Sequence, residues 1–324
     1  MSRTGYAHVT VAELGMGVGP LVRELSENQR AVIVAPPGVG KTTKLPLMML
    51  EAADSGAFTL NGTILLLEPR RVAAVAAARF MAQQLGERVG ETVGYQIRGE
   101  RSSGPLTRIV VVTERLLVRR LQRDPELAGV GAVIFDEVHE RSLSTDLGLA
   151  LLLDATSALR EDLHIVAMSA TPDVDALADA LKRDERPVTV VAVTGAAHEV
   201  TTHYVGRDHR RELEDEVSDI VAQALGDNRS GDVLVFLPGR REIRRTAERL
   251  ARRSISTLTL WGGSDRDGAE VALAPASPSH RRVILSTSVA QTSLTIDGVR
   301  IVVDAGLERL AVYDRHRRVE ALVT

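Results

Sequence analysis

The sequence lacks cysteine altogether and contains few aromatic residues. Without cysteine there can be no disulfide bond and no cysteine-ligated zinc, and the absence agrees with a reducing compartment such as the cytoplasm. Aromatic residues make up only 3% of the chain, and Trp261 is the single tryptophan. The core must therefore be filled mainly by Ala, Val, Leu and Ile, as in parallel α/β sheets.

Long apolar runs and a strong net charge are missing as well. No stretch of about 18 consecutive apolar residues occurs, and the N-terminus has no apolar segment behind a basic one. We therefore expect a cytoplasmic protein with no membrane contact. A net charge of −3 gives no overall attraction for nucleic acid, so any such site must be local. Basic pairs such as Arg70-Arg71 are candidates, although such clusters are commonly just solvated faces.

Short β-branched runs alternate with longer stretches of helical character, which predicts βαβ units and a parallel sheet. The runs begin at residues 31, 63, 108, 132, 164 and 188, and a second series begins at 232, 256, 281 and 299, with a helix around 240–253. A polar, charged stretch over 194–216 separates the two series, and we place the domain boundary within it, near 195–205. We predict a lead-in over 1–20, a first domain over 21–195, and a second domain over 196–324 that has too few strands to be complete.

The segment AVIVAPPGVGKTTKLPL, residues 31–47, combines a strand, a Pro/Gly turn and the start of a helix. This is the context of a phosphate-binding loop, in which backbone N–H groups and the helix N-terminus face phosphate oxygens. Lys41 would pair with the β- and γ-phosphates of ATP, and the Thr42 hydroxyl would bind Mg²⁺. Ala35 stands where the general pattern has its first glycine. We expect nucleotide contacts from Pro37, Gly38, Val39, Gly40, Lys41, Thr42 and Thr43.

A second apolar strand ends in Asp136 and Glu137, within AVIFDEVHERS. At the carboxyl edge of a parallel sheet, beside the strand of the phosphate loop, Asp136 would hold Mg²⁺ and Glu137 would polarise the attacking water. Alone, an Asp-Glu pair after a strand is a helix cap about half the time, but the phosphate loop upstream favours the catalytic interpretation. His139 has no partners for zinc, so we do not expect it to bind a metal.

The string DEVHERSL resembles the DExH-box helicases of superfamily 2, in their DEAH/RHA branch, and APPGVGKTT and LEPRRVAA are similar to bacterial HrpB-type helicases. Further family motifs follow in order: Ser169-Ala170-Thr171, VLVFLPG from 233 and STSVAQTSLTIDGV from 286. The resemblance implies two RecA-like domains with ATP between them and a single strand, RNA rather than DNA, across the top. An ATP-dependent RNA helicase motor is the function that it implies. The sequence does not give the oligomeric state, for which a monomer is our working expectation.

Motif matches also assign roles to individual residues. The resemblance implies nucleic-acid contacts from Arg70, Arg71, Thr113, Thr292 and Thr295, a nucleotide contact from Asp297, and coupling of hydrolysis to domain movement by His139, Ser169 and Thr171. The Ser-Ala-Thr segment has a plainer alternative, a loop that leads into a helix capped by Asp173 or Thr171. The pattern also departs from the family: Arg115 stands where a glycine is usual, and Gln291 and Ser288 replace a glutamate and an asparagine.

The family's motif VI, which carries an arginine finger, would be expected to follow near Thr324. Such a finger contributes on the order of 10³ to 10⁵ in rate, so we expect this chain to bind ATP better than it hydrolyses it. Two alternatives remain beside the helicase motor. One is an ATP-responsive nucleic-acid-binding or regulatory remnant without unwinding activity, and the other is a P-loop kinase or unrelated ATPase, which does not explain why the other motifs occur in order.

Overall fold

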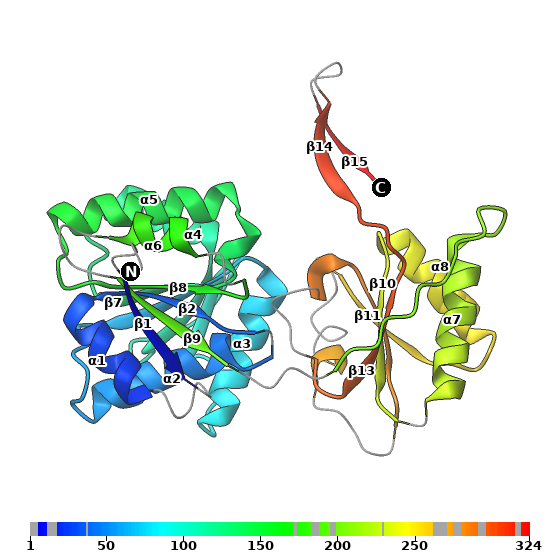
Figure 1. The fold of residues 1–324 in the computed structure, drawn as a ribbon, viewed down its shortest axis with the longest axis horizontal. Coiled ribbons are helices and arrows are strands. Elements are labelled where there is room, and N and C mark those ends of the chain that lie inside the picture. The colour runs from blue at the N-terminus through cyan, green and yellow to red at the C-terminus, as the bar shows by residue number, and fades with distance from the viewer. Residues whose placement is uncertain are drawn as a thin grey trace, which may run out of the picture. The chain divides into compact units, whose positions relative to one another are not determined.

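The computed structural model describes most of the chain and divides it into two compact units, Met1–Glu199 and Val200–Thr324 (Figure 1). The described residues are 6–11, 18–36, 38–171, 174–182, 188–194, 199–228, 230–261, 271–274, 280–290, 296–314 and 319–324. None of the helices in these ranges is both long and apolar enough to cross a membrane.

Unit 1 is built on a nine-stranded sheet in the order β1-β9-β2-β8-β7-β3-β6-β4-β5. All neighbouring strands run parallel except β4 and β5, which form an antiparallel edge pair. The strands are β1 (Tyr6–Val11), β2 (Arg30–Val34), β3 (Thr63–Glu68), β4 (Val93–Ile97), β5 (Glu100–Ser102), β6 (Ile109–Thr113), β7 (Val130–Phe135), β8 (His164–Ser169) and β9 (Val188–Val193).

Helices cover both faces of this sheet. One core layer joins the strands to α1 (Val18–Asn28), α2 (Lys41–Asp54) and α3 (Arg71–Gln84), and the other joins them to α4 (Glu114–Arg123), α5 (Leu143–Ala158) and α6 (Asp175–Leu181). Successive strand residues enter opposite layers, as the period of two requires: Ile64 and Leu66 pack in the first layer, Leu65 and Leu67 in the second. Burial on both faces explains why these strands are continuous apolar runs.

Unit 2 contains a four-stranded parallel sheet in the order β11-β12-β10-β13 and a separate antiparallel pair of β14 and β15. Its elements are α7 (Leu213–Asp227), β10 (Asp232–Phe236), α8 (Arg240–Ala251), β11 (Thr257–Leu260), β12 (Val283–Ser286), β13 (Val299–Asp304), β14 (Leu310–Asp314) and β15 (Val319–Val323). The α7 and α8 helices pack together, and buried side chains from both join those of the strands in one core.

The predicted α/β class is confirmed, and all ten predicted strand runs form strands. Three features differ from the sequence interpretation. Residues 6–11 of the predicted lead-in form β1 and pair with β9, the edge pair β4 and β5 was not predicted, and α7 occupies part of the stretch interpreted as polar connection. The Asp136 strand does not lie beside the phosphate-loop strand, because β8 runs between β2 and β7.

Candidate functional site

The carboxyl ends of five parallel strands bring most of the predicted first-domain residues to one edge of the unit 1 sheet. The loop after β2 leads to Lys41, Asp136 and Glu137 follow β7, and Ser169 ends β8. Arg70 follows β3 shortly after its end, and Thr113 ends β6. Parallel strands present all their carboxyl ends on the same side, so the strand order alone gathers these residues.

The loop between β2 and α2 has the backbone that a phosphate cradle needs. Gly38 and Gly40 have φ angles of 83° and 82°, in the left-handed region that favours glycine. A Cβ at Gly38 would meet nothing within 4 Å, so it is the backbone conformation and not a lack of space that favours glycine there. The loop is fixed at its start, where the Ala35 N–H donates to the Ser169 carbonyl at 3.0 Å. Pro37 lies outside the described residues.

Lys41 begins α2 and is buried, although it carries a charge. Its Nζ lies 3.2 Å from Oε1 of Glu137, and the two side chains are only 6% and 4% exposed. Apart from this ion pair, Nζ has no hydrogen-bond partner among the described residues. A buried ammonium group with unused N–H donors fits a site built for an anion, because such a group is costly to bury without partners.

Thr42 and Asp136 form the second contact between the loop and β7. The Thr42 hydroxyl donates to Oδ2 of Asp136, while Oδ1 accepts the Glu137 N–H at 2.8 Å. A hydroxyl and one carboxylate are hard oxygen donors, which suits Mg²⁺, an ion that keeps several waters and takes few protein ligands. Across the described ranges no three His, Asp or Glu side chains gather into a ligand set, so a closed metal cage of that kind is not found there.

Burial controls the protonation of the acidic pair. Burial raises the pKa of Glu137 to about 7, with a further upward contribution from Asp136, and Lys41 opposes both. Burial also raises the pKa of Asp136, against the lowering effects of Lys41 and of the Thr42 hydrogen bond. A carboxyl with a pKa near neutrality can accept a proton from water and release it again at ordinary pH.

His139 links Glu137 to β8. Its Nε2 lies 3.2 Å from Oε2 of Glu137, and its Nδ1 accepts the Ala170 N–H at 3.2 Å. Burial and the nearby Lys41 lower the pKa of His139, so the neutral ring with its proton on Nε2 satisfies both contacts. The histidine therefore orients the Glu137 carboxylate while contacting the Ser-Ala-Thr segment.

The Ser-Ala-Thr segment forms a compact turn. Ser169 Oγ accepts the Thr171 N–H at 3.1 Å and donates to the Thr171 carbonyl at 3.0 Å. Thr171 is not the N-cap of α6, because this helix begins at Asp175 with Val174 at its N-cap and no side-chain cap. Asp173 itself lies outside the described residues.

The residues predicted to contact nucleic acid are only partly brought together. Arg70 pairs with Glu140 at 3.3 Å, and Arg71 donates to the Arg98 carbonyl at 3.3 Å from an exposed position at the start of α3. Thr113 is the N-cap residue of α4, without a side-chain cap. In unit 2, Asp297 is exposed in the turn before β13, and Thr292 and Thr295 lie outside the described residues.

Each of the two units matches a protein family model of helicases. Residues 21–180 match the family model described as DEAD/DEAH box helicase, and residues 216–319 match the helicase conserved C-terminal domain. The chain belongs to the DEAD/DEAH box helicases. The two matched regions fall in different units, one on the large sheet and the other on the small one.

Two relatives of this helicase family align with nearly the whole chain. The ATP-dependent RNA helicase HrpB of Escherichia coli strain K12 is 44% identical over 298 residues, which are 91% of this chain and 36% of HrpB. The ATP-dependent RNA helicase HrpA of Borreliella burgdorferi is 31% identical over 290 residues, or 88% of this chain and 34% of HrpA. The chain thus spans about a third of the length of these two relatives.

A solved structure extends the likeness to three dimensions. The crystal structure of the E. coli DEAH/RHA helicase HrpB matches with a TM-score of 0.84 at 42% identity, covering 97% of this chain and 39% of that chain. The resemblance to DExH helicases of the HrpB type, which rested on short motifs, is confirmed. The match also supports RecA-like domains as the description of the two sheets.

Two glutamates of unit 1 were missed in the sequence. Glu68 ends β3 and is fully buried beside Asp136; burial, with the charge of Asp136, raises the pKa of Glu68 well above its ordinary value. Glu114 at the start of α4 accepts hydrogen bonds from Ser142 and Thr145 on α5. Glu68 lies in LEPRR, whose buried strand end was the only sequence signal. Nothing in the local pattern indicated the contacts of Glu114.

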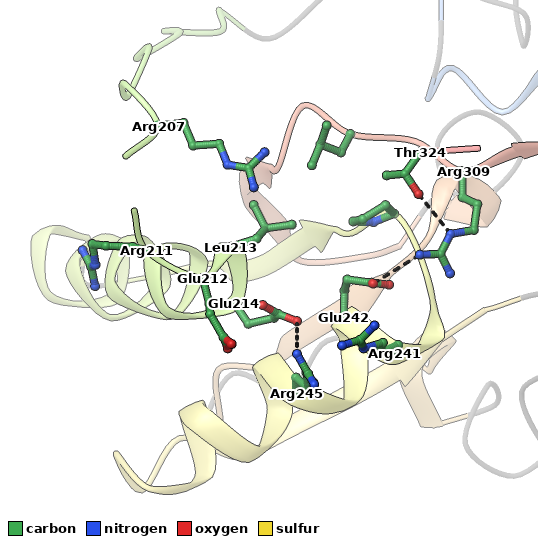
Figure 2. Close-up of a pocket in the computed structure, with 12 residues that line it drawn as sticks. Arg207, Arg211, Glu212, Leu213, Glu214, Arg241, Glu242, Arg245, Arg309 and Thr324 are labelled. Atoms are coloured by element: carbon green, nitrogen blue, oxygen red, sulfur yellow. Dashed lines mark hydrogen bonds and ion pairs between the residues drawn. The ribbon is translucent and has the colours of Figure 1, made fainter. Parts of the chain in front are cut away.

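Unit 2 has a charged cleft of about 310 Å³ beside the N-termini of α7 and α8 (Figure 2). Arginines and glutamates line it together, and dashed lines in Figure 2 join Arg245 to Glu214 and Arg309 to Glu242, at 3.8 Å and 3.2 Å. Of the residues that the structure describes, none that was predicted to bind nucleotide or nucleic acid lines this cleft. Because the acidic groups offset much of the arginine charge, we assign no ligand to it.

Proposed function

We propose that the chain is the motor of an ATP-dependent RNA helicase, with two RecA-like domains over 21–195 and 196–324. The observation that carries the proposal is the assembly of Lys41, Thr42, Asp136 and Glu137 at one sheet edge, with a buried lysine that has unused donors. RNA as the nucleic acid rests on the two relatives, HrpB and HrpA, which are both ATP-dependent RNA helicases.

In the proposed mechanism the loop from Gly38 to Thr43 surrounds the phosphates with backbone N–H groups. Lys41 exchanges its contact with Glu137 for the β- and γ-phosphates, which leaves the Glu137 carboxylate to accept a proton from the attacking water. The neutral ring of His139 keeps that carboxylate in place. Mg²⁺ held by the Thr42 hydroxyl and Asp136 would neutralise charge on the phosphate oxygens.

Movement and nucleic-acid binding complete the proposal. His139 touches both Glu137 and Ala170, so a change at the γ-phosphate can be transmitted to the Ser169–Thr171 turn. Arg70, Arg71 and Thr113 in the first domain, with Thr292 and Thr295 in the second, contact the backbone of a single strand. Each phosphate that the arginines neutralise releases counterions and adds affinity.

The test is ATP turnover by the purified chain with and without single-stranded RNA, with single-stranded DNA as a parallel arm. Turnover that rises with RNA and disappears in Lys41→Ala supports the proposal. The matched control is Lys182→Ala, which removes an exposed lysine at the end of α6 and should leave turnover unchanged. Nucleotide binding without any response of turnover to RNA or DNA would point instead to a nucleotide-responsive binding protein.

A further inference from the structure

Glu114 joins two helices that start at the functional edge of unit 1. Its Oε2 accepts a hydrogen bond from the Ser142 hydroxyl and its Oε1 accepts one from the Thr145 hydroxyl, each at 2.5 Å. Ser142 also caps α5 by accepting the Thr145 N–H at 2.9 Å. Both carboxylate oxygens are thus used, and hydrogen bonds to an ionised carboxylate are among the stronger ones in proteins.

The positions of these residues in the chain give the contact its meaning. Glu114 directly follows Thr113, a proposed nucleic-acid contact at the end of β6. Ser142 directly follows the segment that contains Glu137 and His139. No residue separates the pair from its functional neighbours: Thr113 directly precedes Glu114, and the catalytic loop, residues 137–141, directly precedes Ser142.

The backbone of the catalytic loop has an unfavourable conformation at both of its ends. Glu137 and Arg141, its first and last residues, both have positive φ angles, 51° and 52°. Non-glycine residues hold this left-handed conformation at a cost, so it persists where contacts on both sides fix the chain. Asp136 fixes one side through the Glu137 N–H, and Ser142 fixes the other through Glu114.

A second polar contact ties the same loop to the same edge. Glu140, in the middle of the loop, pairs with Arg70 at 3.3 Å, and Arg70 is itself a proposed nucleic-acid contact. The loop is therefore joined to two strand ends that the proposed function places against the nucleic-acid backbone, those of β3 and β6.

We infer that Glu114 is a positioning residue that couples nucleic-acid binding at the Thr113 strand end to the geometry of the catalytic loop. The inference rests on the proposed function, because it takes Thr113 as a nucleic-acid contact and Glu137 as the base. A strand bound at Thr113 would stabilise one position of the α4 N-terminus, and the Glu114 contacts carry that position to Ser142 and the loop.

Coupling between two sites has a direct measure. If nucleotide changes the affinity for RNA by some factor, RNA must change the affinity for nucleotide by the same factor, and couplings of about 5- to 150-fold are typical. The experiment measures the dissociation constant of a fluorescent single-stranded RNA with and without a non-hydrolysable ATP analogue and Mg²⁺. The ratio of the two constants is the readout, and it needs no turnover.

Glu114→Ala is expected to bring the ratio to within about 2-fold of one, while the affinity for the ATP analogue alone changes by less than about 2-fold. Thr145→Val, which keeps the side-chain shape but removes one of the two hydroxyl donors, should reduce the ratio partly. Glu114→Gln should keep most of it, since an amide can still accept one hydrogen bond and donate another. The matched control is Asp175→Asn, which removes an acidic residue from the first turn of α6 and should leave the ratio unchanged.

The outcomes separate the inference from the proposed function. If the wild-type chain binds no RNA, the proposed function fails and the inference fails with it. If wild type shows coupling and Glu114→Ala retains the full ratio, the inference alone is wrong. A ratio that stays constant while nucleotide affinity and melting temperature fall together would also overturn it, because Glu114 would then only support the fold. Should Glu114→Ala not fold, Thr145→Val and Glu114→Gln decide the question by the same ratio.

Discussion

Replacing Glu137 by glutamine should stabilise the fold at alkaline pH while removing catalysis. The pKa of Glu137 is raised from 4.5 to about 7, so the native state binds this proton more tightly than the unfolded chain does. The contribution of this proton to the free energy of unfolding is fully present below pH 4.5 and is lost as pH rises through about 7. In the nucleotide-free protein, the ionised form of Glu137 is therefore the destabilising one.

The size of the effect follows from the shift. At about 1.4 kcal/mol per pKa unit, the difference corresponds to about 3 kcal/mol, and we expect about 2–3 kcal/mol after allowing for partial screening by solvent. Glutamine has the same shape and stays neutral, so the free energy of unfolding of Glu137→Gln should exceed that of wild type by this amount at pH 8.5 and match it at about pH 4. Such a trade of stability for function is common at active sites.

Amide hydrogen exchange, read by mass spectrometry without nucleotide or divalent cation, is the suitable assay. Peptides from β7 and β8 report the opening of unit 1, and peptides from β10 and β12 in unit 2 serve as an internal reference. Protection of β7 and β8 should be greater in Glu137→Gln than in wild type at pH 8.5, with the difference vanishing toward about pH 4. An equal or lower protection at pH 8.5 would refute the assignment of a raised pKa to Glu137.

Three further predictions concern other parts of the chain. Asp232→Ala should destabilise unit 2 by about 1.5–3 kcal/mol, because it removes the carboxylate partner of the largely buried Arg282 guanidinium. Urea denaturation followed by the fluorescence of the single tryptophan checks this. Gly62→Ala should lower the free energy of unfolding by at least about 1–3 kcal/mol, since φ is 123° and a Cβ would lie 2.2 Å from a carbonyl oxygen. Gly56→Ala, where φ is 77° and a Cβ would meet open space, should lower it less. Thermal denaturation of the two variants compares them. Arg70→Ala should weaken binding of all single strands alike and reduce the slope of log affinity against log salt by about 0.7, as measured by titrations at several salt concentrations.

The sequence predicted those parts of the fold that are encoded locally. Runs rich in Val, Ile and Leu identified β2, β3 and β6 to β13. In most of these strands, though not in β11 or β13, burial on both faces leaves a nearly continuous apolar run. The order of the strands was not accessible in this way. The position of β8 between β2 and β7 depends on contacts between segments that are distant in the sequence. The same holds for the pairing of β1 with β9, which lie near the two ends of the unit 1 sequence.

The site shows the same division. The phosphate loop and the Asp136-Glu137 pair were predictable, because the chemistry requires particular residue types at fixed spacing beside a strand. The contact of His139 with Ala170 follows only from the adjacency of β7 and β8, and the contacts of Glu114 only from the packing of α4 on α5. Contacts between side chains on different helices and strands depend on the tertiary structure, so a local sequence pattern does not predict them.

The most direct test of the central claim, that the Lys41 edge of unit 1 binds ATP with Mg²⁺, is calorimetric titration of the chain with ATP in the presence and absence of Mg²⁺. The account predicts that wild type binds ATP and that Mg²⁺ strengthens this binding. Thr42→Val should still bind ATP, but with a weaker dependence on Mg²⁺. Lys41→Ala should abolish ATP binding, whereas Lys182→Ala should leave it intact. ATP binding of equal strength in wild type and Lys41→Ala would contradict the account, because the nucleotide would then have to bind elsewhere.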